Sequence, residues 1–147
     1  NSFFMNKALE QAQLALENQE VPVGAILVRG DKIIGKGYNQ CISTNDPSAH
    51  AEIIALRNAA RSLKNYRLQG SIMYVTLEPC LMCAGALVNA RVDEVIFSTR
   101  DPKAGVVVSN ACLLEETFLN HKVRFSQGAF SEKSAKLLKI FFEDKRH

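Results

Sequence analysis

Along this chain, short apolar runs of strand length alternate with longer segments whose apolar residues recur at helical spacing. Val23 to Val28 and Ile33 to Tyr38 flank the turn at 29–32, so they predict a β-hairpin. Later strands are expected at 71–76, 92–98 and 122–126, and helices at 9–16, 49–63, 79–89 and 131–145. Because strands after the hairpin alternate with helices, we predict an α/β fold, a three-layer α/β/α sandwich around a mixed five-stranded sheet.

Two segments predict loops rather than regular structure. The stretch from Asn39 to Ser48 carries turn and capping residues. Pro102 and Gly105 interrupt the stretch from Thr99 to Asn120, which we expect to be a loop with one short helix.

The composition describes a globular protein of a single domain, residues 1–147, with 47% hydrophobic and 22% charged residues. No apolar run approaches the roughly 20 residues of a membrane span, and the first residues lack the pattern of a signal peptide. We therefore expect a cytoplasmic protein with no membrane partner, whose four cysteines stay reduced. The net charge of +3 is compatible with a nucleic-acid partner and equally with a metabolic enzyme.

Two short motifs stand at the beginnings of predicted helices: His50-Ala51-Glu52 and Pro79-Cys80-Leu81-Met82-Cys83. Residues three apart share a helix face, so Cys80 and Cys83 can bind one ion together. Residues two apart do not, so His50 and Glu52 reach one site only if it lies beyond the amino-terminal end of their helix. We therefore expect two helix amino termini to meet at one point, where their dipoles favour thiolates and other anions.

One imidazole and two thiolates suit zinc and leave the fourth tetrahedral position to water. We expect His50, Cys80 and Cys83 to hold one zinc ion per chain, which acidifies that water. Glu52, which is not needed as a ligand, is expected to be the catalytic residue that takes up the proton and returns it to a leaving amine. This chemistry is hydrolytic deamination of an amidine-like carbon.

A structural zinc site is the non-enzymatic alternative. It would need a fourth protein ligand, which Cys41 or Cys112 could supply, and the chain would then be a zinc-stabilised RNA-binding module. A thiol redox motif would need no His-x-Glu partner. Otherwise Cys41 and Cys112 are expected to be reduced structural thiols, and His121 and His147 ordinary core or surface residues.

The motifs H-x-E and P-C-x-x-C are the known signature of zinc-dependent nucleobase deaminases. Together with Glu20–Ala25, Asp46–Glu52, Glu78–Ala86 and Asp101–Gly105, they resemble the bacterial tRNA-specific adenosine deaminases of the cytidine/deoxycytidylate deaminase superfamily. The resemblance covers the chain from Met5 to Phe142. It implies a cytidine-deaminase-like fold, a homodimer, and conversion of the wobble adenosine of a tRNA anticodon stem-loop to inosine, with zinc-bound hydroxide attacking C6.

The same resemblance implies substrate contacts. Asn39 would contact the flipped nucleotide, Val21 would help to wall the base pocket and Ala51 would belong to the substrate-binding residues. Asp101 and Asn120 would lie near the backbone of the anticodon loop. Val106–Val108 and Glu143-Asp144 depart from the family pattern, which usually has small residues with a glycine at the first place and a basic residue at the second.

Several assignments have a second interpretation. The shared zinc chemistry also fits a free-base or nucleoside deaminase acting on guanine or cytosine. Asp101 could simply start the turn at Pro102, and Asn39 could satisfy its own backbone. Lys133, Lys136 and Lys139 recur opposite the apolar face of the last helix, where they either contact RNA phosphates or form a solvated face. Phe141 and Phe142 are expected in the core.

Overall fold

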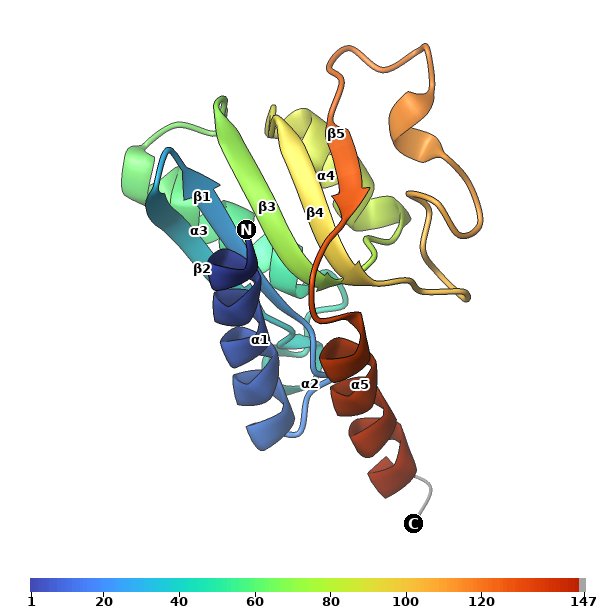
Figure 1. Ribbon diagram of the computed structural model, residues 1–147. Coiled ribbons are helices and arrows are strands. Elements are labelled where there is room, and N and C mark those ends of the chain that lie inside the picture. The colour runs from blue at the N-terminus through green and yellow to red at the C-terminus, as the bar shows by residue number, and fades with distance from the viewer. Residues whose placement is uncertain (146–147) are drawn as a thin grey trace.

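A mixed sheet of five strands forms the centre of the computed structural model, which describes residues 1–145 (Figure 1). The strands are β1 (Gly24–Arg29), β2 (Lys32–Tyr38), β3 (Ser71–Leu77), β4 (Glu94–Thr99) and β5 (Arg124–Gln127). Their order is β2-β1-β3-β4-β5, in which β1 is antiparallel to both neighbours while β3, β4 and β5 run parallel. The predicted mixed five-stranded sheet is therefore confirmed.

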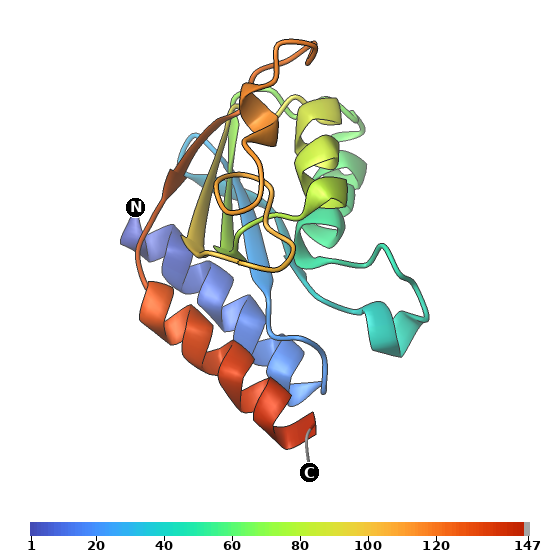
Figure 2. The ribbon, with the colours of Figure 1, turned by 90° about the vertical axis from the view of Figure 1, so that its right-hand side faces the viewer.

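Helices cover both faces of this sheet, as the side view shows (Figure 2). On one face, α1 (Ser2–Glu17) lies beside α5 (Ser131–Lys145); on the other lie α3 (Ala51–Leu63) and α4 (Leu81–Asn89). The larger apolar core joins the sheet to α3 and α4, and a smaller one lies beneath α1. The prediction of a three-layer sandwich is confirmed.

Over residues 1–145, every helix is too short or too polar to pass through a lipid bilayer.

Several predicted boundaries shift in the structure. The first helix begins at Ser2 rather than near Leu9, because Phe4, Met5 and Ala8 extend its buried face toward the amino terminus. The predicted loop from Asn39 to Ser48 contains a short helix, α2 (Cys41–Thr44), and the 3₁₀ turn η1 (Leu113–Glu115) is the short helix expected in the later loop.

Sequence periodicity misses α2 because its stabilising contact comes from a distant residue. The carboxylate of Glu20, itself only 1% exposed, accepts hydrogen bonds from the backbone N–H groups of Ile42 (3.0 Å) and Ser43 (2.6 Å). These are otherwise unpaired donors of the first helical turn.

The two carboxyl-terminal phenylalanines differ in burial. Phe141 is buried, as predicted, but Phe142 is 50% exposed, so the prediction that both belong to the core is wrong for Phe142. Adjacent residues on a helix point about 100° apart, and only one of the two faces the sheet. His147 lies outside the described residues.

Helix α3 lies unusually close to β2. A Cβ atom placed on Gly37 would overlap the carbonyl oxygen of Ala51 and stand 2.6 Å from the backbone nitrogen of Ala55. Gly35 is equally close to α3 one turn further along the helix, where an added Cβ atom would overlap the carbonyl oxygen of Ala55 and approach Ala59. Glycine on the strand and alanine on the helix therefore fix the distance at which the amino terminus of α3 stands from the sheet.

We predict that Gly37→Ala lowers the free energy of unfolding by about 1–3 kcal/mol, because the added methyl group meets rigid backbone atoms of α3. Gly85→Ala is the matched control, since a Cβ there meets nothing within 4 Å inside α4. It should stabilise the protein by up to about 1 kcal/mol through helix propensity. Urea denaturation measures both; equal stability of Gly37→Ala and the wild type would contradict the tight packing.

Candidate active site

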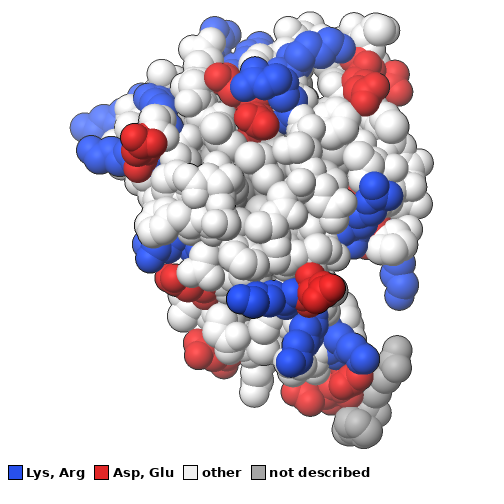
Figure 3. Space-filling view, viewed as in Figure 1, with Lys and Arg blue, Asp and Glu red and all other residues white. Residues whose placement is uncertain are grey.

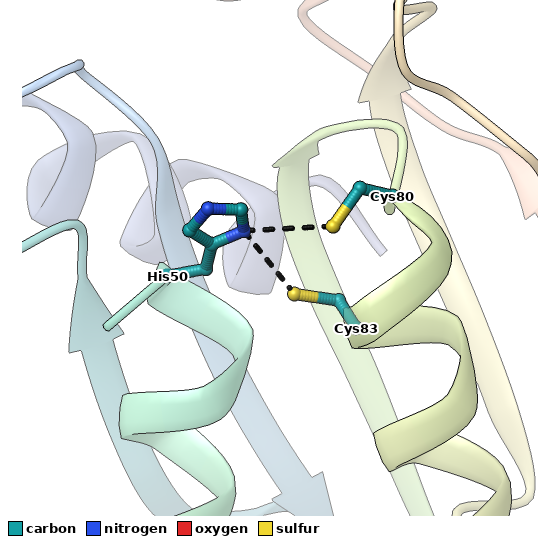
Figure 4. A group of neighbouring side chains, drawn as sticks. All are labelled: His50, Cys80 and Cys83. Atoms are coloured by element: carbon teal, nitrogen blue, oxygen red, sulfur yellow. Dashed lines mark hydrogen bonds between the residues drawn. The ribbon is translucent and has the colours of Figure 1, made fainter. Parts of the chain in front are cut away.

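Three side chains converge where α3 and α4 begin. His50 is the N-cap residue of α3, Cys80 is the N-cap residue of α4, and Cys83 lies in the first turn of α4. Figure 4 shows all three pointing into the space between the two helix ends. The helices begin at Ala51 and Leu81 rather than at the predicted 49 and 79, so two of the three side chains project from caps. The meeting point lies beyond the helix ends, as the spacing of His50 and Glu52 requires.

The distances describe a compact donor group. Nδ1 of His50 lies 3.6 Å from Sγ of Cys80 and 3.5 Å from Sγ of Cys83. The three ligand atoms all lie within 4.8 Å of one another. Among the histidine, cysteine and acidic side chains of residues 1–145, these three form the group whose ligand atoms lie close enough together to hold a metal ion. One nitrogen and two sulfur donors fit zinc better than the oxygen-preferring cations.

The remaining cysteines lie apart from this group. Cys41 is partly exposed, with its sulfur 3.9 Å from the carbonyl oxygen of Pro47, and Cys112 is exposed. Neither joins the donor group within the described chain, and all four cysteines are free thiols. A donor group of three leaves a coordination position open, which is typical of catalytic rather than structural zinc sites.

Interactions within the donor group give the thiols of Cys80 and Cys83 very different pKa values. The hydrogen bond with Cys83, followed by that with His50, lowers the pKa of Cys80 to about 3. The pKa of Cys83 rises, because it is the donor to Cys80 and is fully buried. The hydrogen bond with Cys80 also raises the pKa of His50. The pair thus holds one thiolate, and a cation would have to displace the second proton.

Glu52 lies beside the donor group in the first turn of α3. Its side chain is only 4% exposed, and desolvation raises its pKa to about 7. The neighbouring Cys83 thiol lowers this pKa, but its effect is smaller than that of desolvation. A carboxyl group with a pKa near neutrality can both accept and release a proton at physiological pH.

Asn39 holds the amino terminus of α3 in place. His50 makes no side-chain capping bond; instead, Oδ1 of Asn39 accepts a hydrogen bond of 2.7 Å from the backbone N–H of Ala51. Nδ2 of Asn39 makes no hydrogen bond within residues 1–145, so it remains a donor for a ligand. The alternative interpretation, in which the side chain of Asn39 hydrogen-bonds with its own backbone, is wrong, because Oδ1 of Asn39 accepts from the first N–H of α3 instead.

A cavity of about 180 Å³ opens onto this group. Its lining combines apolar residues with polar and ionisable ones: Val21, Val23, Asn39, His50, Glu52, Leu77, Glu78, Cys80, Asp101 and Ala104. A larger hollow of about 400 Å³ lies between α1 and α5, on the opposite face of the sheet from the donor group. We assign the site to the smaller cavity because the chemically competent side chains face it.

The structure brings Val21, Asn39 and Asp101 to this cavity. Asp101 also starts the predicted turn, since its Oδ1 accepts hydrogen bonds from the backbone N–H groups of Lys103 (3.0 Å) and Ala104 (3.2 Å). Ala51 does not line the cavity: its side chain is fully buried against β2. The substrate contact of Ala51 stays a prediction; in the structure the side chain of this residue, between His50 and Glu52, faces the sheet.

Asn120, predicted to lie near the backbone of the anticodon loop, does not line this cavity. It lines a different hollow, with Arg91 and Phe118, near the carboxyl-terminal end of α4. Its neighbour His121 hydrogen-bonds through Nε2 to the carbonyl oxygen of Val92, just before β4. Because β4 and β5 run parallel, the loop that leads into β5 lies at the amino-terminal ends of these strands. The cavity lies at the other end, where β3 and β4 finish. Asn120 is therefore separated from the cavity by the length of a strand.

Glu78 is a site residue that sequence reasoning misses. It is 2% exposed, lines the cavity and accepts five hydrogen bonds from the segment 101–109. Burial is the largest effect on its pKa and raises it, but the hydrogen bonds from Ser109, Val108 and Asp101 together outweigh burial and lower the pKa. A glutamate that directly continues a buried strand is the signal that could have revealed it.

The lysines of α5 point to solvent. All three are exposed; Lys139 pairs with Glu143 at 4.0 Å, and Lys133 lies 4.8 Å from the centroid of the Phe130 ring. Figure 3 shows basic and acidic side chains intermingled at the lower end of the molecule rather than one continuous basic surface. This arrangement favours the interpretation of a solvated helix face.

Comparison with known proteins identifies the family of the chain. The sequence matches the MafB19-like deaminase family over residues 1–146. The tRNA-specific adenosine deaminases of Buchnera aphidicola subsp. Schizaphis graminum and Aquifex aeolicus are both 46% identical to it. The alignments cover 99% of this chain with each relative, and 96% and 95% of the relatives.

A solved structure of a tRNA:A34 deaminase, studied for A-to-I editing at the wobble position of transfer RNA, matches with a TM-score of 0.90 at 38% identity. The match covers 94% of this chain and 100% of that one. The chain belongs to the family of tRNA-specific adenosine deaminases.

We predict that Asn39→Ala lowers the free energy of unfolding by about 1–2 kcal/mol, because the buried N–H of Ala51 loses its acceptor. Asn39→Asp keeps the acceptor oxygen and should retain most of that stability. Thermal and urea denaturation of the two variants measure the difference. If both variants lose the same stability, the hydrogen bond to α3 is not what Asn39 contributes.

Proposed function

We propose that this chain deaminates adenosine to inosine hydrolytically at the wobble position of a tRNA anticodon. The observation that carries the proposal is the buried Glu52 beside a nitrogen-and-sulfur donor group that is open on one side, within a chain of this family. A zinc-stabilised module would have no use for an acid with a raised pKa at that place.

His50, Cys80 and Cys83 would hold one zinc ion per chain. Two thiolates and one imidazole balance the charge of the ion, and the two helix amino termini add a field that favours the thiolates. When bound, zinc lowers the pKa of water and so supplies the nucleophile of hydrolysis.

Glu52 is the proton carrier among the acids of the cavity. Glu78 has both oxygens engaged by hydrogen bonds, and its lowered pKa keeps it ionised. Asp101 uses Oδ1 for its own turn. Glu52 alone combines burial, a pKa of about 7 and contact with the donor group, so it takes the proton from water and delivers it to the departing amine.

The cavity selects one extruded base. At about 180 Å³ it has room for a single nucleobase and not for a stacked pair, which fits an enzyme that acts on a base turned out of its loop. Val21 is proposed to pack against the base, and Nδ2 of Asn39 to donate a hydrogen bond to the nucleotide. Asp101, which also lines the cavity, is proposed to approach the RNA.

The protein is proposed to act in the cytoplasm, where tRNA is found, and as a homodimer, as the family resemblance implies. Leu81 and Met82 lie in the first turn of α4, between Cys80 and Cys83 of the donor group, and are 65% and 37% exposed. Neighbouring exposed apolar side chains of this kind support a protein interface there.

We predict that the purified protein contains about one zinc ion per chain, and that Cys83→Ala loses it together with activity. Glu52→Gln should lower turnover by at least about 10²-fold, because the neutral amide cannot accept a proton, while zinc content stays at the wild-type level. Elemental analysis and single-turnover kinetics measure both quantities. Zinc loss in Glu52→Gln would make Glu52 a ligand instead of a proton carrier.

The substrate assignment is tested with an anticodon stem-loop that carries wobble adenosine, compared with free adenosine, guanine and cytidine. We expect inosine to form only in the RNA, because a single extruded base must be delivered by contacts outside the cavity. Nucleoside analysis after digestion measures the product. Turnover of a free base or nucleoside with none of the stem-loop would establish the alternative, a free-base or nucleoside deaminase.

A further inference from the structure

The carboxylate of Glu78 is surrounded by the loop that follows β4. Its Oε1 accepts hydrogen bonds from the backbone N–H of Asp101 (3.1 Å) and from the hydroxyl of Ser109. Its Oε2 accepts from the consecutive N–H groups of Val107 (3.0 Å), Val108 (2.9 Å) and Ser109 (3.0 Å). Consecutive backbone donors that converge on one oxygen form a concave anion-binding loop.

The loop has little regular structure of its own to set this shape. It contains no strand and no α-helix between Arg100 and Cys112. It approaches the carboxylate so closely that a Cβ on Gly105 would stand 2.6 Å from Oε2 of Glu78. Because hydrogen bonds to a charged acceptor are stronger than neutral ones, Glu78 is the main fixed point around which the segment 101–109 is organised.

The same residue connects this loop to the metal-binding segment. Glu78 directly follows β3 and precedes Pro79-Cys80; its N–H donates to the carbonyl oxygen of Thr99 (2.9 Å), and the N–H of Val106 donates to that of Pro79 (3.1 Å). The loop in turn supplies Asp101 and Ala104 to the cavity lining. The buried Glu78 side chain, together with these two backbone hydrogen bonds, therefore fixes the position of a cavity wall relative to Cys80.

We propose that Glu78 is a positioning residue, which holds the segment 101–109 in the conformation that receives the RNA substrate. It does not act on the reacting atoms, because its hydrogen-bonding capacity is filled by the loop. This inference rests on the proposed function, since the ligand that the wall receives is the nucleotide and its flanking RNA.

Glu78→Gln tests the proposal. The amide keeps the size of the side chain but replaces one acceptor with an NH₂ group that faces backbone N–H donors. We expect hydrogen exchange at the amides of Val107, Val108 and Ser109 to accelerate by about 10- to 100-fold. The KM for the anticodon stem-loop should rise by a similar factor, with kcat within about threefold and zinc content unchanged.

Ser134→Ala is the matched control for lost stability. It removes a buried hydrogen bond of 2.9 Å between Ser134 and Ser98, which links α5 to β4 on the other side of the sheet. It should lower the melting temperature but leave KM and the exchange of the 101–109 amides unchanged. If Glu78→Gln does not fold, Ser109→Ala carries the test; it deletes the hydroxyl donor and leaves the backbone bonds, so the same changes should appear at smaller size.

Wild-type exchange and KM in a folded Glu78→Gln protein would overturn the proposal. A fall in kcat and zinc content at unchanged KM would also overturn it, because Glu78 would then act through Cys80. If the wild-type enzyme leaves the stem-loop unreacted, the proposed function fails separately. Hydrogen exchange then decides the inference by itself: faster exchange of the loop amides supports it and unchanged exchange refutes it.

Discussion

The candidate site depends on one constraint, that two helices begin side by side at the edge of the sheet where β3 ends. The close contact of α3 with Gly35 and Gly37 sets the distance of this helix from the sheet. The short connection from β3 through Pro79 sets the position at which α4 begins. His50 and Cys80 are cap residues, so their side chains project from the helix ends into the space between them. Without that convergence, the donors would be separate residues on two helix faces.

Three buried glutamates show how surroundings decide the role of one side-chain type. Glu20 accepts hydrogen bonds from N–H groups in the first turn of α2, and Glu78 accepts hydrogen bonds from the segment 101–109; in each case these hydrogen bonds replace those with water. Glu52 has far fewer donors to compensate its burial, and its pKa rises to about 7. The glutamate with the least compensation is therefore the one that suits proton transfer, and the compensated ones hold the loops around it.

The sequence predicted most of the fold because alternating strands and amphipathic helices carry their own periodicity. It placed β1 to β5 and the long helices correctly in order, and it identified which short motifs stand at helix beginnings. It missed α2, which depends on Glu20 more than twenty residues earlier, and it placed Phe142 in the core although the structure leaves this side chain 50% exposed. These errors share a cause: burial and capping are decided by partners distant in the chain.

What the sequence determined by itself is the pair of motifs, His-x-Glu and Cys-x-x-Cys at helix beginnings, on which the proposed metal, open position and proton carrier rest. What only the tertiary structure decided is which other residues belong to the site. Asn39 and Asp101 line the cavity, Ala51 faces the sheet, Asn120 lies at the opposite edge, and Glu78 organises the loop. The physical reason is that spacing within a helix is local and fixed by its geometry, whereas the cavity wall is built from loops whose shape depends on hydrogen bonds to distant groups.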